Sequence, residues 1–213
     1  MNNCIIKYEE AIDYINDGDI LLFRGTGIIS SIIQAIGEGY YSHVGMASWT
    51  YDKEGNKQSL DCIEFREWIG SRAINLDNYV NDNPGLIDVF RPVPEYTIMK
   101  YCCKQRIPVE TKIKYDGKKL ADEFRLLTGL PYGWGRIFWL AQFHLLGFRL
   151  FNWKAGLEDV DSKKEFYPVC STIVAYLFAK HYTRFLHFRS SDRTEPSDIA
   201  RSPILNYMFT LVP

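Results

Sequence analysis

Residues 41–49 read Tyr-Ser-His-Val-Gly-Met-Ala-Ser-Trp, an apolar-rich run with several small side chains. A second such run, Leu-Asp-Cys-Ile-Glu-Phe, follows at 60–65, and a polar loop with Gly55 and Asn56 at its centre separates the two. Gly-Asn pairs favour tight chain reversals between strands. The two runs are therefore predicted to pair as an antiparallel hairpin.

The hairpin contains one histidine and one candidate carboxylate partner. Side chains alternate between the two faces of a strand. His43 therefore shares a face of the first strand with Gly45, and Glu64 lies on one face of the second strand. A contact between His43 and Glu64 is therefore available. The loop length leaves the register open by a residue or two, so Glu67 remains an alternative partner. The small neighbours Ser42 and Gly45 leave space around the imidazole.

Cys170 is the candidate nucleophile. It follows the turn Phe-Tyr-Pro-Val at 166–169 and begins a helical pattern that is predicted to continue to about Lys180. A thiol reacts as its thiolate, and both a helix N-terminus and a nearby imidazole favour that form. Together with His43 and Glu64, and with the Cys170 backbone N–H as an oxyanion donor, this arrangement predicts cysteine hydrolase chemistry.

The rest of the chain mixes helical and strand patterns. Apolar periodicity and breakers predict helices at 8–16, from 28 through 36 and at 118–128. They predict strands at 19–24 and 86–91, and a loop followed by a closing strand in the last 20 residues. We expect an α+β fold in which a small antiparallel sheet packs against the helix that carries Cys170.

Length and charge limit the classes of function. A chain of 213 residues suits one compact domain over 1–213, with a core of its own. The formal net charge is −1, and the lysines and arginines are scattered, so no nucleic-acid partner is expected. The basic cluster at 112–119 is interrupted by Asp116 and Gly117 and is predicted to be a solvated loop.

The sequence suggests a cytoplasmic protein with reduced thiols. The first residues are polar and precede no long apolar run, so no signal peptide is expected. The longest apolar stretch, 137–148, is well short of the ~20 residues that span a bilayer and contains Gln142 and His144. The five cysteines have no framework spacing, which favours free thiols over disulfides.

The sequence motifs support metal-dependent and serine-dependent chemistry less well. The chain has no CxxC, HxxxH or HExxH pair, so no metal site is expected. A serine mechanism would use Ser171 or Ser42, but neither lies in a G-x-S-x-G elbow. The remaining histidines, His144, His181 and His187, stay possible bases, although each falls in a helical or aromatic context.

Six short motifs occur in an order that resembles a known family. They are Gly-Asp-Ile-Leu-Leu-Phe at 18–23, Tyr-Ser-His-Val-Gly-Met at 41–46, Ile-Glu-Phe at 63–65, Leu-Pro-Tyr-Gly-Trp at 130–134, Val-Cys-Ser at 169–171 and Pro-Ser-Asp-Ile-Ala at 196–200. The order is similar to that of the YiiX-like permuted branch of the NlpC/P60 superfamily, in which the histidine strand precedes the cysteine helix. The resemblance covers about residues 18 to 203.

This resemblance implies a circularly permuted papain-like fold and a Cys-His-Glu triad. Cys170 would be the nucleophile, His43 the base and Glu64 the residue that orients the imidazole. Tyr132 is similar to a tyrosine that lines the substrate cleft in the family, and the neighbouring Tyr41 and Ser42 are further candidates for substrate binding. The implied reaction is cysteine amidase or peptidase hydrolysis of a small peptide or cell-wall-type amide, without a cofactor.

Two rival functions stay open. Permuted relatives include lipid-directed acyl hydrolases and acyltransferases, and residues 134–151 carry many large apolar side chains that would suit lipid or membrane-surface contact. The same stretch would equally suit a buried helix. The other rival is a ligand-binding module on an inactive enzyme fold, against which the intact Cys170 and His43 argue.

Overall fold

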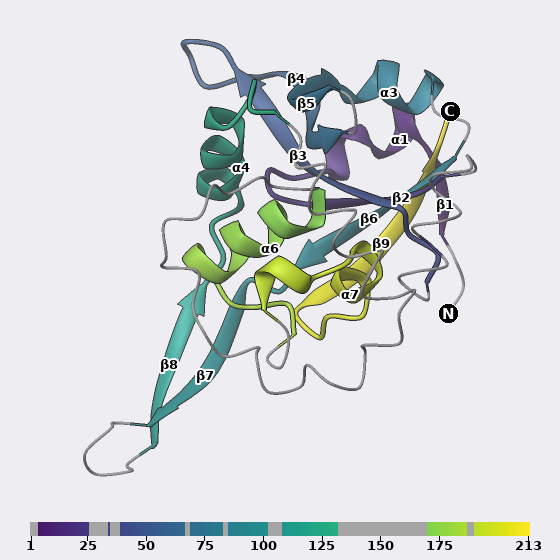
Figure 1. The fold of residues 1–213 in the computed structure, drawn as a ribbon. Helices are drawn as coiled ribbons and strands as arrows, with labels where there is room; N and C mark the ends of the chain where they lie inside the picture. The colour runs from purple at the N-terminus through teal and green to yellow at the C-terminus, as the bar shows by residue number, and fades with distance from the viewer. Residues whose placement is uncertain are drawn as a thin grey trace.

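The computed structural model describes residues 4–25, 34, 39–66, 69–82, 85–101, 108–131, 170–186 and 190–213. These residues form an α+β fold in which helices pack on both faces of one large sheet (Figure 1).

The described strands are, in chain order, β1 Ile5–Lys7, β2 Ile20–Arg24, β3 His43–Tyr51, β4 Lys57–Arg66, β5 Gly70–Asn75, β6 Leu86–Pro92, β7 Glu95–Tyr101, β8 Pro108–Lys114 and β9 Leu205–Val212. The helices are α1 Tyr8–Ala11, α3 Leu76–Asp82, α4 Gly117–Leu126, α6 Cys170–His181 and α7 Pro196–Ala200, with short 3₁₀ turns at Ile12–Tyr14 and Ser191–Arg193.

Seven of these strands form one sheet in the order β1-β9-β6-β2-β3-β4-β5. Its neighbouring strands are antiparallel except β1 and β9, which run parallel. The C-terminal strand thus lies between the first strand of the chain and β6, and β2 and β3 occupy the middle of the sheet. Residues from the two ends of the chain therefore meet at one side of the sheet, where β9 lies between β1 and β6.

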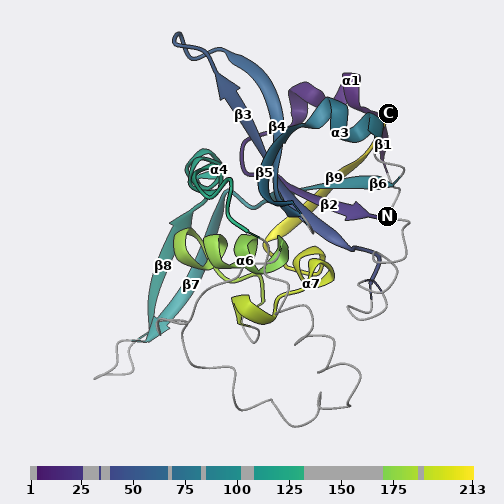
Figure 2. The same ribbon diagram turned by 45° about the horizontal axis from the view of Figure 1, so that its top comes forward.

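Two apolar cores lie on the two faces of this sheet. One contains side chains of α4, α6 and α7 packed on residues such as Leu22, Val44 and Phe65. The other contains side chains of α1 and α3 packed on residues such as Phe23 and Leu60. Figure 2 shows the sheet between the two groups of helices. Both faces of the first seven residues of β3 are therefore buried.

Strands β7 and β8 form a separate two-stranded ribbon that projects from the body of the fold in both views (Figures 1 and 2). Its base is attached to the main core, because Tyr96 and Ile113 pack against the cluster that contains α6. Helix α4 follows at once, and the Asp116 side chain accepts a hydrogen bond of 3.0 Å from the Lys119 N–H at the start of this helix.

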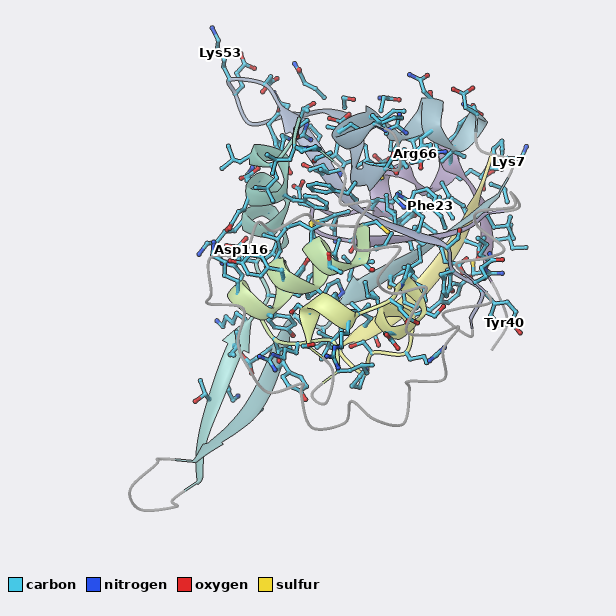
Figure 3. All side chains as sticks on the ribbon, viewed as in Figure 1. Lys7, Phe23, Tyr40, Lys53, Arg66 and Asp116 are labelled. Atoms are coloured by element: carbon cyan, nitrogen blue, oxygen red, sulfur yellow. The ribbon has the colours of Figure 1, made fainter. Side chains whose placement is uncertain are left out.

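Several sequence predictions are confirmed. The runs 41–49 and 60–65 pair as the β3–β4 hairpin, whose tip around Lys53 extends beyond the sheet (Figure 3). The strands predicted at 19–24 and 86–91 are β2 and β6, and the helix predicted at 118–128 is α4. Helix α6 begins at Cys170 and ends at His181, and β9 is the closing strand.

Other predictions need correction. The sheet is larger than the small antiparallel sheet expected, because β1, β5 and β9 extend it and one pair is parallel. The helix predicted at 8–16 is one turn of α1 followed by a 3₁₀ turn. The lysines at 112–119 lie on β8 and α4 and not in a loop, because residues 108–114 pair with β7 and α4 begins at Gly117. Most of the helix predicted through residue 36 lies outside the described residues, as does the whole of 134–151.

No helix in the described part of the chain is both long and apolar enough to cross a membrane.

Candidate active site

The hairpin register brings Glu64 to His43. Gly45 lies opposite Glu64, and the β3–β4 pairing ends at this pair, so His43 is two residues further along on the same face. Residues in this diagonal relation are ~7–8 Å apart at Cα, within reach of a glutamate and an imidazole. The side chains meet, with His43 Nε2 2.6 Å from Glu64 Oε2. Glu67, the alternative partner, lies outside the described residues.

Glu64 is a fully buried carboxylate contacted by four donor atoms of three side chains. Oε2 faces His43 and accepts a hydrogen bond of 2.7 Å from the Tyr79 hydroxyl on α3. Oε1 accepts from Arg72 Nε at 2.7 Å and lies 2.6 Å from Arg72 Nη2. Arg72 is the residue opposite Glu64 on β5. A buried carboxylate is costly without such partners, so this set explains how Glu64 stays in the core.

Those partners hold Glu64 in its ionised form. Burial alone would raise its pKa, but the charges of His43 and Arg72 and the hydrogen bonds from His43 and Tyr79 lower the pKa of Glu64 to about 2. The phenol responds in the opposite sense, since burial and the negative charge of Glu64 raise the pKa of Tyr79. At neutral pH, Glu64 is therefore an anion that accepts this hydrogen bond, and Tyr79 is a neutral phenol that donates it.

Apolar and aromatic contacts fix the imidazole ring. The Phe23 ring lies 5.3 Å from that of His43 and 5.0 Å from that of Tyr79, between centroids. Phe23 is also the residue paired with His43 across β2 and β3. Figure 3 shows Phe23 and Arg66 in one region beneath α3, and Arg66 bonds to Tyr79 there. The ring is thus held by packing on one side and by a hydrogen bond at Nε2.

Cys170 reaches the site from the other core. It is the first residue of α6 and is buried against the cluster that contains Val44 and Phe65. Helix α6 packs on β3 and β4, which places its first residue at the sheet. The opening N–H groups of a helix have no partner within the helix, and the helix dipole favours negative charge there. The last turn carries Lys180 and His181, which suits the opposite end of the dipole.

Cys170 interacts electrostatically with His43. Burial alone would lower the pKa of His43, but its electrostatic interactions with Cys170 and Glu64 raise it to about 10. Nδ1 of His43 is buried and forms no regular hydrogen bond with a described residue, although Cys170 is near enough to contribute to the raised pKa of His43. Glu64 occupies Nε2, so Nδ1 is the ring nitrogen left for a proton exchanged with Cys170. The predicted Cys170, His43 and Glu64 are therefore brought together.

The candidate substrate residues are placed differently. The Tyr41 hydroxyl donates to Asp88 at 2.6 Å, and the buried Ser42 accepts from the Gly25 N–H through Oγ at 3.2 Å. Both side chains thus make contacts within the fold. Tyr132 lies outside the described residues, but the segment before it is attached to the sheet edge, where Ser71 and Leu130 share a backbone hydrogen bond of 2.8 Å.

His181 does not serve as an alternative base for Cys170. The two residues lie at opposite ends of α6, ~16 Å apart at the usual helical rise. His181 instead forms an ion pair with Glu123 of α4. His144 and His187 lie outside the described residues.

Within the described ranges, no group of three or more His, Cys, Asp and Glu side chains is arranged to hold a metal ion. Both oxygens of Glu64 are occupied by protein donors, one of which is a guanidinium. The contact with the Arg72 cation disfavours Glu64 as a ligand of a second cation.

Sequence reasoning missed Arg66, Arg72 and Tyr79. Arg72 lies on a strand too polar to be recognised, and Tyr79 lies on a short helix that follows it. One signal was present: a carboxylate in a predicted buried strand needs a cationic partner, and arginines follow Glu64 at 66 and 72.

No protein-family model matches the chain, and a search of the curated proteins gives no match. Among solved structures, the chain is similar to the crystal structure of the metalloprotein YiiX (DUF1105) from Escherichia coli O157:H7. The match has a TM-score of 0.55 at 15% sequence identity and covers 93% of this chain and 98% of that one. The chain therefore has a YiiX-like fold.

Proposed function

We propose that this protein is a cysteine hydrolase of the amidase or peptidase type, built on a circularly permuted papain-like fold of the NlpC/P60 kind. Cys170 is the nucleophile, His43 the general base and acid, and Glu64 the residue that orients His43. One observation carries the proposal. His43 is bonded to Glu64 at Nε2 and is electrostatically coupled to a cysteine at the start of a helix.

The mechanism follows from these positions. Nδ1 of His43 takes the proton of Cys170, and the thiolate attacks the substrate carbonyl carbon. The N–H groups at the start of α6 stabilise the oxyanion that forms. The C–N bond then breaks, and His43 returns the proton to the leaving amine. Water gives a proton to His43 and attacks the thioester, which releases the acid and restores Cys170.

Chain order supports the permuted fold. The histidine strand β3 precedes the cysteine helix α6 by more than a hundred residues. Motif resemblance supports a small peptide or cell-wall-type amide as substrate. A lipid acyl substrate or an acceptor other than water would use the same thioester. These alternatives therefore differ only in the acyl donor and in the acceptor that receives the acyl group.

The test is to trap the acyl-enzyme. The protein is mixed with p-nitrophenyl acetate, which acylates reactive thiols, and the acetyl group is located by peptide mass spectrometry. We expect a burst of p-nitrophenol followed by slow turnover, with the acetyl group on Cys170. Cys62→Ala is the matched control, because Cys62 is a buried cysteine on β4 whose pKa is raised by burial.

A burst that persists in Cys170→Ala would contradict the proposal. A burst without turnover would indicate an acyltransferase that awaits another acceptor, and addition of amines or long-chain alcohols identifies which acceptor restores turnover. Acetylation spread over several lysines, with Cys170 unmodified, would favour the binding-module alternative.

A further inference from the structure

A chain of hydrogen bonds links Arg66, Tyr79, Glu64 and His43, and its bonds converge on Glu64. Arg66 Nη1 lies 2.6 Å from the Tyr79 hydroxyl, and the Tyr79 hydroxyl lies 2.7 Å from Glu64 Oε2. A guanidinium has donors only, so the Tyr79 oxygen accepts from Arg66 and its own hydrogen points to Glu64. Every bond in the chain is therefore donated toward Glu64.

This direction determines the proton position on His43. An ionised carboxylate can only accept, so His43 Nε2, at 2.6 Å from Glu64 Oε2, must carry a hydrogen. The neutral ring then has its lone pair on Nδ1, the nitrogen that forms no regular hydrogen bond with a described residue. If Glu64 were protonated, it could donate to Nε2 and move the ring hydrogen to Nδ1, where it would prevent uptake of the thiol proton.

Glu64 therefore has to remain an anion when His43 is neutral. At that stage of a hydrolytic cycle the imidazole no longer supplies a positive charge to Glu64. Arg72 supplies a permanent one to Oε1, from the position directly opposite on β5. The two oxygens thus have separate partners, Arg72 on one and the His43 and Tyr79 pair on the other.

We propose that Arg72 and Tyr79 are positioning residues, which keep Glu64 ionised and aimed at His43 Nε2 while the imidazole gains and loses its proton. Arg66 orients Tyr79 in this role. The inference rests on the proposed function of Cys170 and His43 and adds the residues that set the tautomer of the base.

The charged and titratable groups around Glu64 come from four elements. They are His43 of β3, Arg72 of β5, Tyr79 of α3, and Cys62 and Arg66 of β4, the strand that carries Glu64. Cys170 of α6 acts on His43. Arg72 is the permanent cation in contact with the carboxylate. Its removal should raise the proton affinity of the whole group.

The first measurement is the rate of Cys170 alkylation by iodoacetamide as a function of pH. Arg72→Met should shift the profile to higher pH by about one unit, and Arg72→Lys, which keeps the charge, should restore it. Tyr79→Phe should slow alkylation about tenfold with little shift of the profile. The controls, Arg125→Met and Tyr182→Phe, remove an arginine paired with Asp61 and a tyrosine hydroxyl bonded to Val93, and should lower stability without moving the profile.

The second measurement does not need the thiol. ¹⁵N NMR of the ring nitrogens of His43 in Cys170→Ala reports the tautomer of the neutral imidazole. We expect hydrogen on Nε2 with the network intact, and a mixture with the Nδ1–H form in Tyr79→Phe and Arg72→Met. A purely structural role of these residues would leave the tautomer unchanged.

The two measurements distinguish a failure of this inference from a failure of the proposed function. An unshifted Arg72→Met profile together with an unchanged tautomer in Tyr79→Phe would overturn the inference while leaving Cys170 as nucleophile. A wild-type protein without selective alkylation of Cys170 would overturn the proposed function, and the NMR measurement would still decide on the network. Should Arg72→Met fail to fold by circular dichroism, Tyr79→Phe decides alone, because it keeps the ring and removes one hydroxyl.

Discussion

Glu64 pairs with Gly45 across the β3–β4 ladder, and the glutamate side chain passes this glycine on its way to His43. A Cβ atom at position 45 would lie 2.5 Å from Cys62 Sγ, which is closer than packed atoms come, and 3.1 Å from the Ile63 carbonyl oxygen, which is tighter than most such contacts. The absence of a side chain at position 45 thus leaves room for Cys62 and Ile63 of the neighbouring strand.

Gly45→Ala should therefore be destabilising by about 1–3 kcal/mol, as overpacked cores are. The sulfur of Cys62 is the nearest obstacle, so Cys62→Ala should recover a large part of this loss in the double variant. Urea unfolding of the four proteins in the cycle measures the coupling free energy. Strictly additive losses would show that the strain lies with the backbone and not with the sulfur.

His43 and Glu64 should act as one unit in catalysis. Loss of the base in His43→Ala should reduce kcat/KM for the acetate ester by ~10²–10⁴. Glu64→Gln should reduce kcat/KM by up to ~10⁴ with the fold intact, since an amide can present its NH₂ group to the ring and favour the wrong tautomer. The double variant should be little worse than His43→Ala alone. If the two losses multiplied fully, Glu64 would have a role separate from His43.

The buried Glu64 should make stability depend on pH in the acid range. Its pKa is about 2 in the folded protein and 4.5 when exposed, so folding favours the deprotonated form. The resulting stabilisation is fully present above about pH 4.5 and is lost as the pH falls toward 2. Unfolding free energies measured by urea titration across this range should fall more steeply for the wild type than for Glu64→Gln.

Asp122→Asn is the matched control for this pH dependence. Asp122 is an exposed carboxylate that pairs with Lys118 within α4. Its removal should leave the acid slope as it is in the wild type. Equal slopes in the wild type and Glu64→Gln would mean that Glu64 binds its proton equally well in the folded and unfolded chains.

Much of the centre of the fold could be predicted from sequence. The β3–β4 hairpin follows from two apolar runs around a Gly-Asn loop, and α6 follows from the apolar pattern after Cys170. Local chemistry determines both, because turn residues and side-chain periodicity act over a few residues. The same periodicity gave the faces of His43 and Glu64 without giving the register.

The edges of the sheet could not be predicted in this way. Strand β5 reads Gly-Ser-Arg-Ala-Ile-Asn and has no clear alternation, and its place is set by pairing with β4. Strand β1 has three residues and depends on β9, some two hundred residues away. Arg72 could not be assigned for this reason, since its role comes from the strand opposite it.

The central claim is that Cys170 and His43 form a reactive pair, and the pH dependence of selective alkylation tests it most directly. At about pH 6, below the ordinary pKa of a free thiol, limiting iodoacetamide should modify Cys170 ahead of the exposed Cys4 and the buried Cys62. In His43→Ala this early reactivity should disappear, and Cys170 should react only as the pH approaches the ordinary thiol range. Faster labelling of Cys4 at pH ~6, or a Cys170 profile unchanged in His43→Ala, would contradict the account.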